Sequence, residues 1–310
     1  MGARRRCSQR WAQYLLPLFT TAEACALRLV CREFLAAVTE QPWEDWGTVI
    51  QGSIAAWRAC FPRARCANVQ KFTIYGKHRN TPVVDADFVH FEGLQKLRMA
   101  GCSGVTDAAF MHLRGIYKLD MRGCWQTGIT DAAFAHLRGI HTLNMSQCSQ
   151  GGITDAAFAH LRGIHTLDMS YCSQAGVTDA AFAHLRGIHT LRMRNCCQMG
   201  ITDAAFAHLR GIFTLDMCYC NQASITYTDF SHLRGIYTLH MSGCSQDGIT
   251  DAAFAHLRGV HTLHMFGCCH QGITGAAFVH LRGSTRMLYM GFCRPDCIAA
   301  ARALYLHVIA

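Results

Sequence analysis

Cysteine and histidine are the residue types of this chain best suited to bind metals or to act as nucleophiles and bases, and the sequence has 18 of each. Most recur at fixed spacing. Nine cysteines occupy equivalent positions, at Cys102, Cys124, Cys148, Cys172, Cys196, Cys220, Cys244, Cys268 and Cys293. Eight histidines form a second row, at His112, His136, His160, His184, His208, His232, His256 and His280, and four a third, at His141, His165, His189 and His261. A structural metal needs several converging ligands, whereas each row supplies one ligand per step, so we predict no metal site and no cofactor.

Catalytic signatures are also missing from the sequence. It contains no phosphate-binding glycine loop, no H-E-x-x-H motif and no single serine or cysteine beside a single histidine. Every candidate is one copy of a repeated residue, so we do not expect an enzyme.

One cysteine per unit at a fixed position is typical of a small buried residue with a weak hydrogen-bond donor. An odd-numbered row cannot pair within itself, and the N-terminus lacks the pattern of a secretory signal. We therefore expect reduced thiols in a cytoplasmic or nuclear protein.

The elements that carry these rows repeat every 24 residues. Units open at Gly115, Gly139, Gly163, Gly187, Gly211, Gly235 and Gly259, and residues 163–186 form a typical one, G-I-H-T-L-D-M-S-Y-C-S-Q-A-G-V-T-D-A-A-F-A-H-L-R. A fixed period of 20 to 50 residues predicts a solenoid, in which each unit buries its apolar face only against its neighbours. Such a protein presents a long surface.

Each unit divides into a strand half and a helix half. In residues 163–186, Leu167 and Met169 are two apart and share one face of a short strand. Thr178 is placed to cap a short helix, and Gly187 to end it. We expect one short strand and one short helix per unit, giving an α/β solenoid with a curved parallel sheet.

The units before Gly115 and after Gly283 are less regular. We place the first unit at Val69, Phe72 and Ile74, with Lys77 in the cysteine position, and the last at Leu288, Met290 and Cys293. This predicts five parts, namely a basic tail (1–10), a helical segment (11–46), a linker or N-terminal cap (47–66), about ten repeats (67–293) and a C-terminal capping helix (294–310).

The net charge of +9 comes from 29 lysines and arginines against 20 aspartates and glutamates. Much of it is one arginine per unit, at Arg114, Arg138, Arg162, Arg186, Arg210, Arg234, Arg258 and Arg282. A basic excess is typical of proteins that bind nucleic acid or anionic lipid. Since most units also carry an aspartate in T-D-A-A, we interpret the arginine row as a solvated edge and do not expect nucleic acid; a nucleic-acid groove is the alternative. No run of about 18 apolar residues is present, so no membrane span is expected.

The unit resembles the cysteine-containing leucine-rich repeat, L-x-x-L-x-L-x-x-C-x-x-I-T-D followed by a helix ending in leucine. Methionine replaces the third strand leucine throughout, and a phenylalanine is the first helical anchor. The resemblance covers about three quarters of the chain. It implies a curved solenoid whose strands line a concave face that binds proteins.

The N-terminal segment, residues 11–46, has a different character and resembles the F-box. The resemblance is carried by Leu15, Leu18 and Phe19, by C-A-L-R-L-V-C-R-E-F from Cys25 to Phe34, and by Pro42-Trp43. The usual Leu-Pro-x-Glu opening is absent. The resemblance implies docking on the Skp-type adaptor of a cullin ubiquitin ligase, through Leu15, Leu18, Phe19, Leu27, Leu29, Val30, Cys31, Phe34, Pro42 and Trp43. The alternative is a helical cap for the solenoid.

Differences between units are concentrated at the outward strand positions. Because side chains alternate on a strand, these positions lie on the concave face. We predict a partner-binding surface there, formed by Asp120, Arg122, Asp168, Tyr171, Arg192, Arg194, Asp216, Tyr219, His240, His264 and Phe266. Tyrosine and arginine often anchor interfaces. Neutral drift at exposed positions is the alternative explanation.

The sequence thus predicts a substrate-recognition subunit of a cullin-type ubiquitin ligase, with an adaptor bound by the N-terminal segment and a target protein on the concave face. The alternative is a repeat scaffold that binds a protein partner without any ubiquitin connection.

Overall fold

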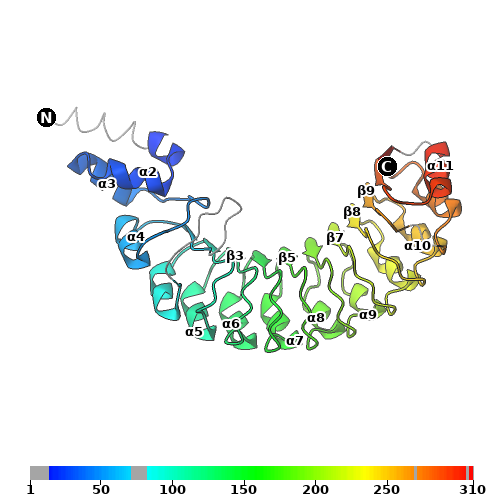
Figure 1. Cartoon of the computed structure of the whole chain (residues 1–310), viewed down its shortest axis with the longest axis horizontal. Helices are drawn as coiled ribbons and strands as arrows, with labels where there is room; N and C mark the ends of the chain where they lie inside the picture. Colours follow the sequence, from blue (N-terminus) through cyan, green and yellow to red (C-terminus); the bar gives the residue numbers. More distant parts are fainter. Residues whose placement is uncertain (1–13, 71–81, 269–270, 305–306, 310) are drawn as a thin grey trace.

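The computed structural model describes residues 14–70, 82–268, 271–304 and 307–309, with the side chains of 227–229 left out. Its strands form one parallel sheet in which each strand pairs with its neighbours in sequence order. The sheet is bent into an arc, with the strands on the inner side and the helical segments on the outer side (Figure 1). The chain is therefore a leucine-rich-repeat solenoid, as the periodicity predicts.

The strands are short and evenly spaced along the chain. They are β1 (Cys66–Asn68), β2 (Lys96–Arg98), β3 (Lys118–Asp120), β4 (Thr142–Asn144), β5 (Thr166–Asp168), β6 (Thr190–Arg192), β7 (Thr214–Asp216), β8 (Thr238–His240), β9 (Thr262–His264), β10 (Met287–Tyr289) and β11 (Val308–Ile309). The central residue of each repeat strand from β2 to β10 is a leucine paired in register with the leucine of the next repeat, and all are fully buried.

The outer side is built from short α-helices and 3₁₀ helices, with one or both in each repeat. These are η2 (Asp85–Phe91), α5 (Asp107–Phe110), η3 (Met111–Leu113), α6 (Asp131–Phe134), η4 (Ala135–Leu137), α7 (Asp155–Phe158), η5 (Ala159–Leu161), α8 (Asp179–Ala183), α9 (Asp203–Phe206), η6 (Tyr227–Leu233), α10 (Asp251–Phe254), η7 (Ala255–Leu257) and η8 (Gly275–Leu281). The helical part of each repeat from α5 to η8 buries one phenylalanine, as Phe158 and Phe182 show, and η2 buries two.

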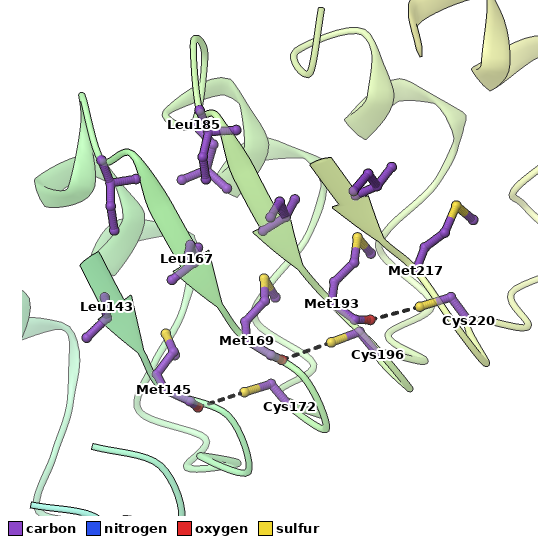
Figure 2. Packing of buried hydrophobic residues seen from close by; sticks show 14 of the residues in the cluster. Leu143, Met145, Leu167, Met169, Cys172, Leu185, Met193, Cys196, Met217 and Cys220 are labelled. Atoms are coloured by element: carbon purple, nitrogen blue, oxygen red, sulfur yellow. Dashed lines mark hydrogen bonds between the residues drawn. The ribbon is translucent and has the colours of Figure 1, made fainter. Parts of the chain in front are cut away.

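The cysteine row forms a ladder of hydrogen bonds between repeats. Each of the nine thiols donates to a backbone carbonyl of the preceding repeat, at S···O distances of 2.6 to 3.5 Å. Figure 2 shows three rungs, including Cys196 to Met169 at 3.0 Å. Burial raises the pKa of the Cys172 thiol to about 12, which keeps it protonated and able to donate. The thiols thus have a structural role, and no described cysteine is disulfide-bonded.

Two further ladders join the repeats. The Thr154 N–H and hydroxyl both donate to the Asp131 carboxylate, at 2.7 Å each, while the Thr154 hydroxyl accepts from Ala156 at the start of α7. The same pairing joins Asp107 to Thr130, Asp155 to Thr178, Asp179 to Thr202 and Asp251 to Thr274. In the second ladder, the buried Gln222 amide donates to the Cys196 carbonyl at 2.6 Å. The threonine of each repeat therefore caps the helix of its own repeat, and the aspartate and glutamine contacts satisfy polar groups across the boundary between repeats.

The N-terminal segment has a small core of its own. It contains η1 (Leu16–Leu18), α2 (Thr21–Leu27) and α3 (Arg32–Glu40), followed by α4 (Ile54–Cys60). Leu16, Ala24, Val38 and Trp43 pack together with Phe61 and Ala64. Trp57 on α4 contacts both this cluster and the solenoid core, so the range 47–66 joins the two parts.

The structure corrects the register of the first repeat. Ala67 pairs with Leu97, so Ala64, Ala67 and Val69 occupy the positions that the sequence assigned to Val69, Phe72 and Ile74. Alanine is too weak an apolar signal to show this register in the sequence. Phe72, Ile74 and Lys77 lie outside the described residues, as does the basic tail 1–10.

The C-terminal end matches its prediction in part. A helix, α11 (Pro295–Ala303), packs on η8 and buries Cys297 and Ala301. The chain then returns to the sheet and adds β11 beside β10, which the sequence analysis did not anticipate.

The cysteine ladder makes a direct prediction about stability. Replacing Cys196 with alanine removes the thiol donor and leaves a small cavity, and we expect a loss of about 1–2 kcal/mol in the free energy of unfolding. The adjacent Cys197 is exposed, so Cys197→Ala should cost less than about 0.5 kcal/mol. Urea denaturation of both variants measures the difference, and equal costs would contradict a structural role for the ladder.

Candidate interaction surfaces

The concave face consists of the outward side chains of each strand and of the three residues that follow it. Threonines form the first row from Thr142 to Thr262, one strand beside the next. The second and third rows carry most of the predicted partner-binding residues. Their types change along the arc, from charged at the N-terminal end to aromatic at the C-terminal end.

The N-terminal part of this face is a network of charged side chains. Asp120 is 5% exposed because Arg98 and Arg122 cover its carboxylate, at 3.4 and 3.1 Å. Arg98 and Lys118 also lie over the ring of Trp46, with the charged groups 4.9 and 5.6 Å from its centre. Trp46 belongs to the N-terminal segment, so that segment forms one wall of the concave face. No pattern in the sequence pointed to this contact.

The middle of the face holds the predicted mixed-charge patch. Arg194 pairs with Asp216 at 3.3 Å, and the Asp216 carboxylate also accepts from the backbone of Cys218. Arg192 is exposed and takes part in none of the six ion pairs among the described residues. Asp120 and Asp216 therefore serve mainly to hold arginines in place, while Arg122, Arg192 and Arg194 are accessible to a partner.

Aromatic residues occupy a strained backbone position on this face. Tyr171 and Tyr219 have φ of 59°, and the equivalent residues of the neighbouring repeats, all with positive φ, are Gly123, Gln147, Asn195, Gly243 and Gly267. A bulky residue in the left-handed region costs about 1 kcal/mol. Both tyrosines are nonetheless about half exposed, with the Tyr219 ring over Gly243. A side chain that costs stability and remains accessible is more consistent with binding than with packing.

The C-terminal part of the face is uncharged and aromatic. His240, His264 and Tyr289 stack with ring centres 4.1 and 4.0 Å apart, and Phe266 packs edge-on against the exposed Phe292. Burial and the neighbouring His240 lower the pKa of His264 to about 4, while Asp216 opposes this shift. The His264 side chain is thus neutral near pH 7. Tyr289 and Phe292 were absent from the predicted surface because the last repeat is displaced by one residue.

A second row of rings was missed by the sequence analysis. Tyr117, His141, His165, His189, Phe213, Tyr237 and His261 form a continuous stack just before the strands, with ring centres 4.4 to 4.7 Å apart. The sequence showed the strand histidines only as a periodic row. They pack against one another, and the substitution of Tyr or Phe at equivalent positions was the available signal.

The N-terminal segment exposes most of the predicted adaptor-binding residues. Leu15, Leu18, Phe19, Leu29, Val30 and Cys31 are exposed, and Leu27, Phe34 and Pro42 are half-buried. Trp43 is 2% exposed, donates its ring N–H to the Val38 carbonyl at 2.8 Å and packs against Phe61. Trp43 is therefore a core residue of the segment and not part of its surface.

Exposed apolar side chains are concentrated on this segment. Of the 21 large hydrophobic side chains that are exposed in the described chain, seven lie within residues 14–35: Tyr14, Leu15, Leu18, Phe19, Leu29, Val30 and Leu35. We call these seven residues the apolar patch. Leu18 and Phe19 also line a pocket with Pro17, Gln41 and Pro42. Monomeric proteins rarely expose so many large apolar groups in so short a segment without a partner.

Other kinds of site find no support in the described residues. They contain no group of three or more histidine, cysteine, aspartate or glutamate side chains placed to hold a metal ion. Within the same residues, no helix has the length and hydrophobicity to cross a membrane. Cys269 and His270 lie outside the described residues.

Comparison with solved structures places the solenoid among leucine-rich-repeat proteins. A structure of the Drosophila Toll–Spatzle complex matches with a TM-score of 0.60 and 13% identity, covering 83% of this chain and 34% of the matched one. A TLR13–ssRNA13 complex matches with a TM-score of 0.60 and 18% identity, covering 75% and 33%. This chain spans about a third of either neighbour, and the likeness concerns the fold. No protein-family model and no curated protein matches the chain.

The buried imidazoles give the concave face a defined pH dependence. Because the pKa of His264 falls from 6.5 in the unfolded chain to about 4, the unfolded state takes up the proton first as the pH drops. The corresponding stability is complete above pH 6.5 and is lost between pH 6.5 and 4. After allowance for solvent screening we expect about 1–2 kcal/mol from this residue. Urea midpoints across this range should fall less steeply in His264→Gln than in the wild type; parallel curves would contradict the assignment.

Proposed function

We propose that the chain is a binding scaffold that links a target protein, held on the concave face, to a Skp-type adaptor of a cullin ubiquitin ligase, held by the N-terminal segment. The observation that carries the proposal is the apolar patch. The segment already has a core, formed by Leu16, Ala24, Val38 and Trp43, so its exposed leucines are not needed to fold it. They remain available for another protein.

The position of the segment supports a connecting role. It lies at one end of the arc, and most of the concave face extends away from it (Figure 1). A partner on the apolar patch and a partner on the central repeats could therefore be bound at the same time. Such an arrangement raises the effective concentration of one partner near the other, and it requires no chemistry from this chain. In this proposal the chain itself is not an enzyme and acts in the cytoplasm or nucleus.

The concave face is the proposed target site. Core positions are nearly identical from repeat to repeat, whereas the outward positions differ and include two strained tyrosines and three accessible arginines. These residue types dominate the energy of many protein interfaces. The Toll–Spatzle neighbour is a complex between proteins, which agrees with a protein partner on this fold. A repeat scaffold with no ubiquitin connection is the second candidate, because the target site alone would serve it equally well.

Adaptor binding is tested by placing charge in the apolar patch. Leu29 and Val30 are 88% and 66% exposed, so Leu29→Asp/Val30→Asp should fold normally and reduce binding of a purified Skp-type adaptor at least 30-fold. Met199→Asp is a matched control, since Met199 is 79% exposed on the solenoid. Deletion of residues 1–46 is a poorer test, because it removes Trp43 from its contact with Phe61. Wild-type protein that fails to retain the adaptor would leave the plain scaffold as the function.

Target binding on the concave face is tested by restoring glycine at the strained positions. Tyr171→Gly/Tyr219→Gly relieves the left-handed strain, so we expect the free energy of unfolding to change by less than about 1 kcal/mol. Recovery of the target by affinity purification and quantitative mass spectrometry should nevertheless fall severalfold, while adaptor binding stays unchanged. Undiminished recovery would place the target elsewhere on the molecule.

A further inference from the structure

The arginine row is a continuous line of cations along one edge of the solenoid. All eight residues, Arg114, Arg138, Arg162, Arg186, Arg210, Arg234, Arg258 and Arg282, are exposed. We call this row the basic edge. Each arginine directly follows the helical part of its repeat, as Arg162 follows η5, and precedes the glycine that leads into the strand.

Among the described residues, no carboxylate forms an ion pair with the basic edge. Six ion pairs occur among the described residues, and none includes an arginine of this row. In most of these repeats the helical part starts at an aspartate and is followed by the arginine. The aspartates therefore lie toward the opposite edge of the solenoid. Asp155, for example, is held by the Thr178 N–H and hydroxyl of the next repeat. The two signs are therefore separated across the solenoid.

Histidines of the neighbouring repeat hold five of the eight arginines in place. Arg138 donates from Nε to His160 Nδ1 at 3.3 Å, and Arg162 does the same to His184. Arg114, Arg186 and Arg210 repeat this contact with the histidine of the next repeat, at 3.3 to 3.4 Å. The acceptor is an unprotonated ring nitrogen, so the contact fixes the guanidinium without cancelling its charge. Repeated contacts of this kind give a row of oriented, unneutralised cations.

The regularity of the basic edge points to a polymer with regularly repeated charge. Neighbouring repeats are separated by 4.4 to 4.7 Å at the ring stack, three residues beyond each arginine. Nucleic acid carries one phosphate per nucleotide whatever its sequence, and arginine binds phosphate in a bidentate way. A flexible single strand can follow a curved edge freely, whereas a duplex must be bent at a cost in deformation energy. A peptide would match such a row only if it carried acidic residues at matching intervals.

We propose that the basic edge binds the phosphate backbone of single-stranded nucleic acid without sequence preference. This reverses the expectation from the sequence, in which the aspartates were taken to offset the arginines. The edge is separate from the concave face and from the apolar patch, so this inference does not depend on the proposed ligase role. The rings beside it are stacked on one another, so their faces are not open to bases, and binding rests on charge.

The test uses fluorescence anisotropy with labelled 20-nucleotide oligo(dT) and oligo(U) at about 50 to 200 mM salt. The wild type should bind both with micromolar affinity at the lower salt, and log K should fall with log salt by about 0.7 per phosphate contacted. Arg138→Gln/Arg162→Gln/Arg186→Gln should weaken binding at least 10-fold and reduce the salt slope by about 2. Binding of one oligonucleotide only would show that sugar or base is read, which contradicts a pure backbone contact.

Two matched variants separate the basic edge from net charge and from folding. Arg32→Gln/Arg63→Gln/Arg302→Gln removes three exposed arginines elsewhere and should change affinity less than threefold. Arg138→Lys/Arg162→Lys/Arg186→Lys keeps the charge and should bind within threefold of the wild type. Equal losses in the two glutamine variants, loss in the lysine variant, or no binding at the lower salt would overturn the proposal. Tighter binding of polyglutamate of equal charge would identify an acidic polypeptide as the ligand instead.

Discussion

The fold depends on contacts between adjacent repeats, and the buried cysteine thiol is the most characteristic of them. A single repeat has too little apolar surface to fold alone, so every stabilising contact must be shared with a neighbour. The Met169 carbonyl accepts both the Cys172 N–H of its own repeat and the Cys196 thiol of the next one. The thiol therefore supplies the second hydrogen bond of a carbonyl that water cannot reach. The glutamine and Asp–Thr ladders add further hydrogen bonds between the same repeats.

These ladders explain why the surface can vary while the core does not. Each core position contacts its own equivalent in the next repeat, so a change in one unit must fit two neighbours. Outward strand positions have no such constraint, and they differ along the arc from charged to aromatic. The arginines of the basic edge lie between these cases, since they are exposed yet repeated without change. Their contacts with histidines of the next repeat, such as Arg162 with His184, account for part of that constancy.

The repeat architecture could be predicted from the sequence because the periodic leucines, phenylalanines and cysteines report burial directly. The register of the first repeat could not, since Ala64 and Ala67 give almost no apolar signal at strand positions. Trp43 was assigned to a surface by its resemblance to a motif, and only its contacts with Val38 and Phe61 show that it is buried. The ring stack joins residues that are one repeat apart, and the contact of Trp46 with Arg98 joins residues that are far apart in the sequence. Pattern analysis of one repeat at a time does not detect such contacts.

The central claim is that the N-terminal segment docks an adaptor while the solenoid keeps its surfaces free for other partners. Hydrogen exchange of the full chain, with and without a purified Skp-type adaptor, tests this most directly because it reports every segment at once. The account predicts slower exchange in α2, α3 and the turn that carries Leu29 and Val30, with unchanged exchange in β3 to β9. Unchanged exchange in the N-terminal segment, or protection confined to the concave strands, would contradict it.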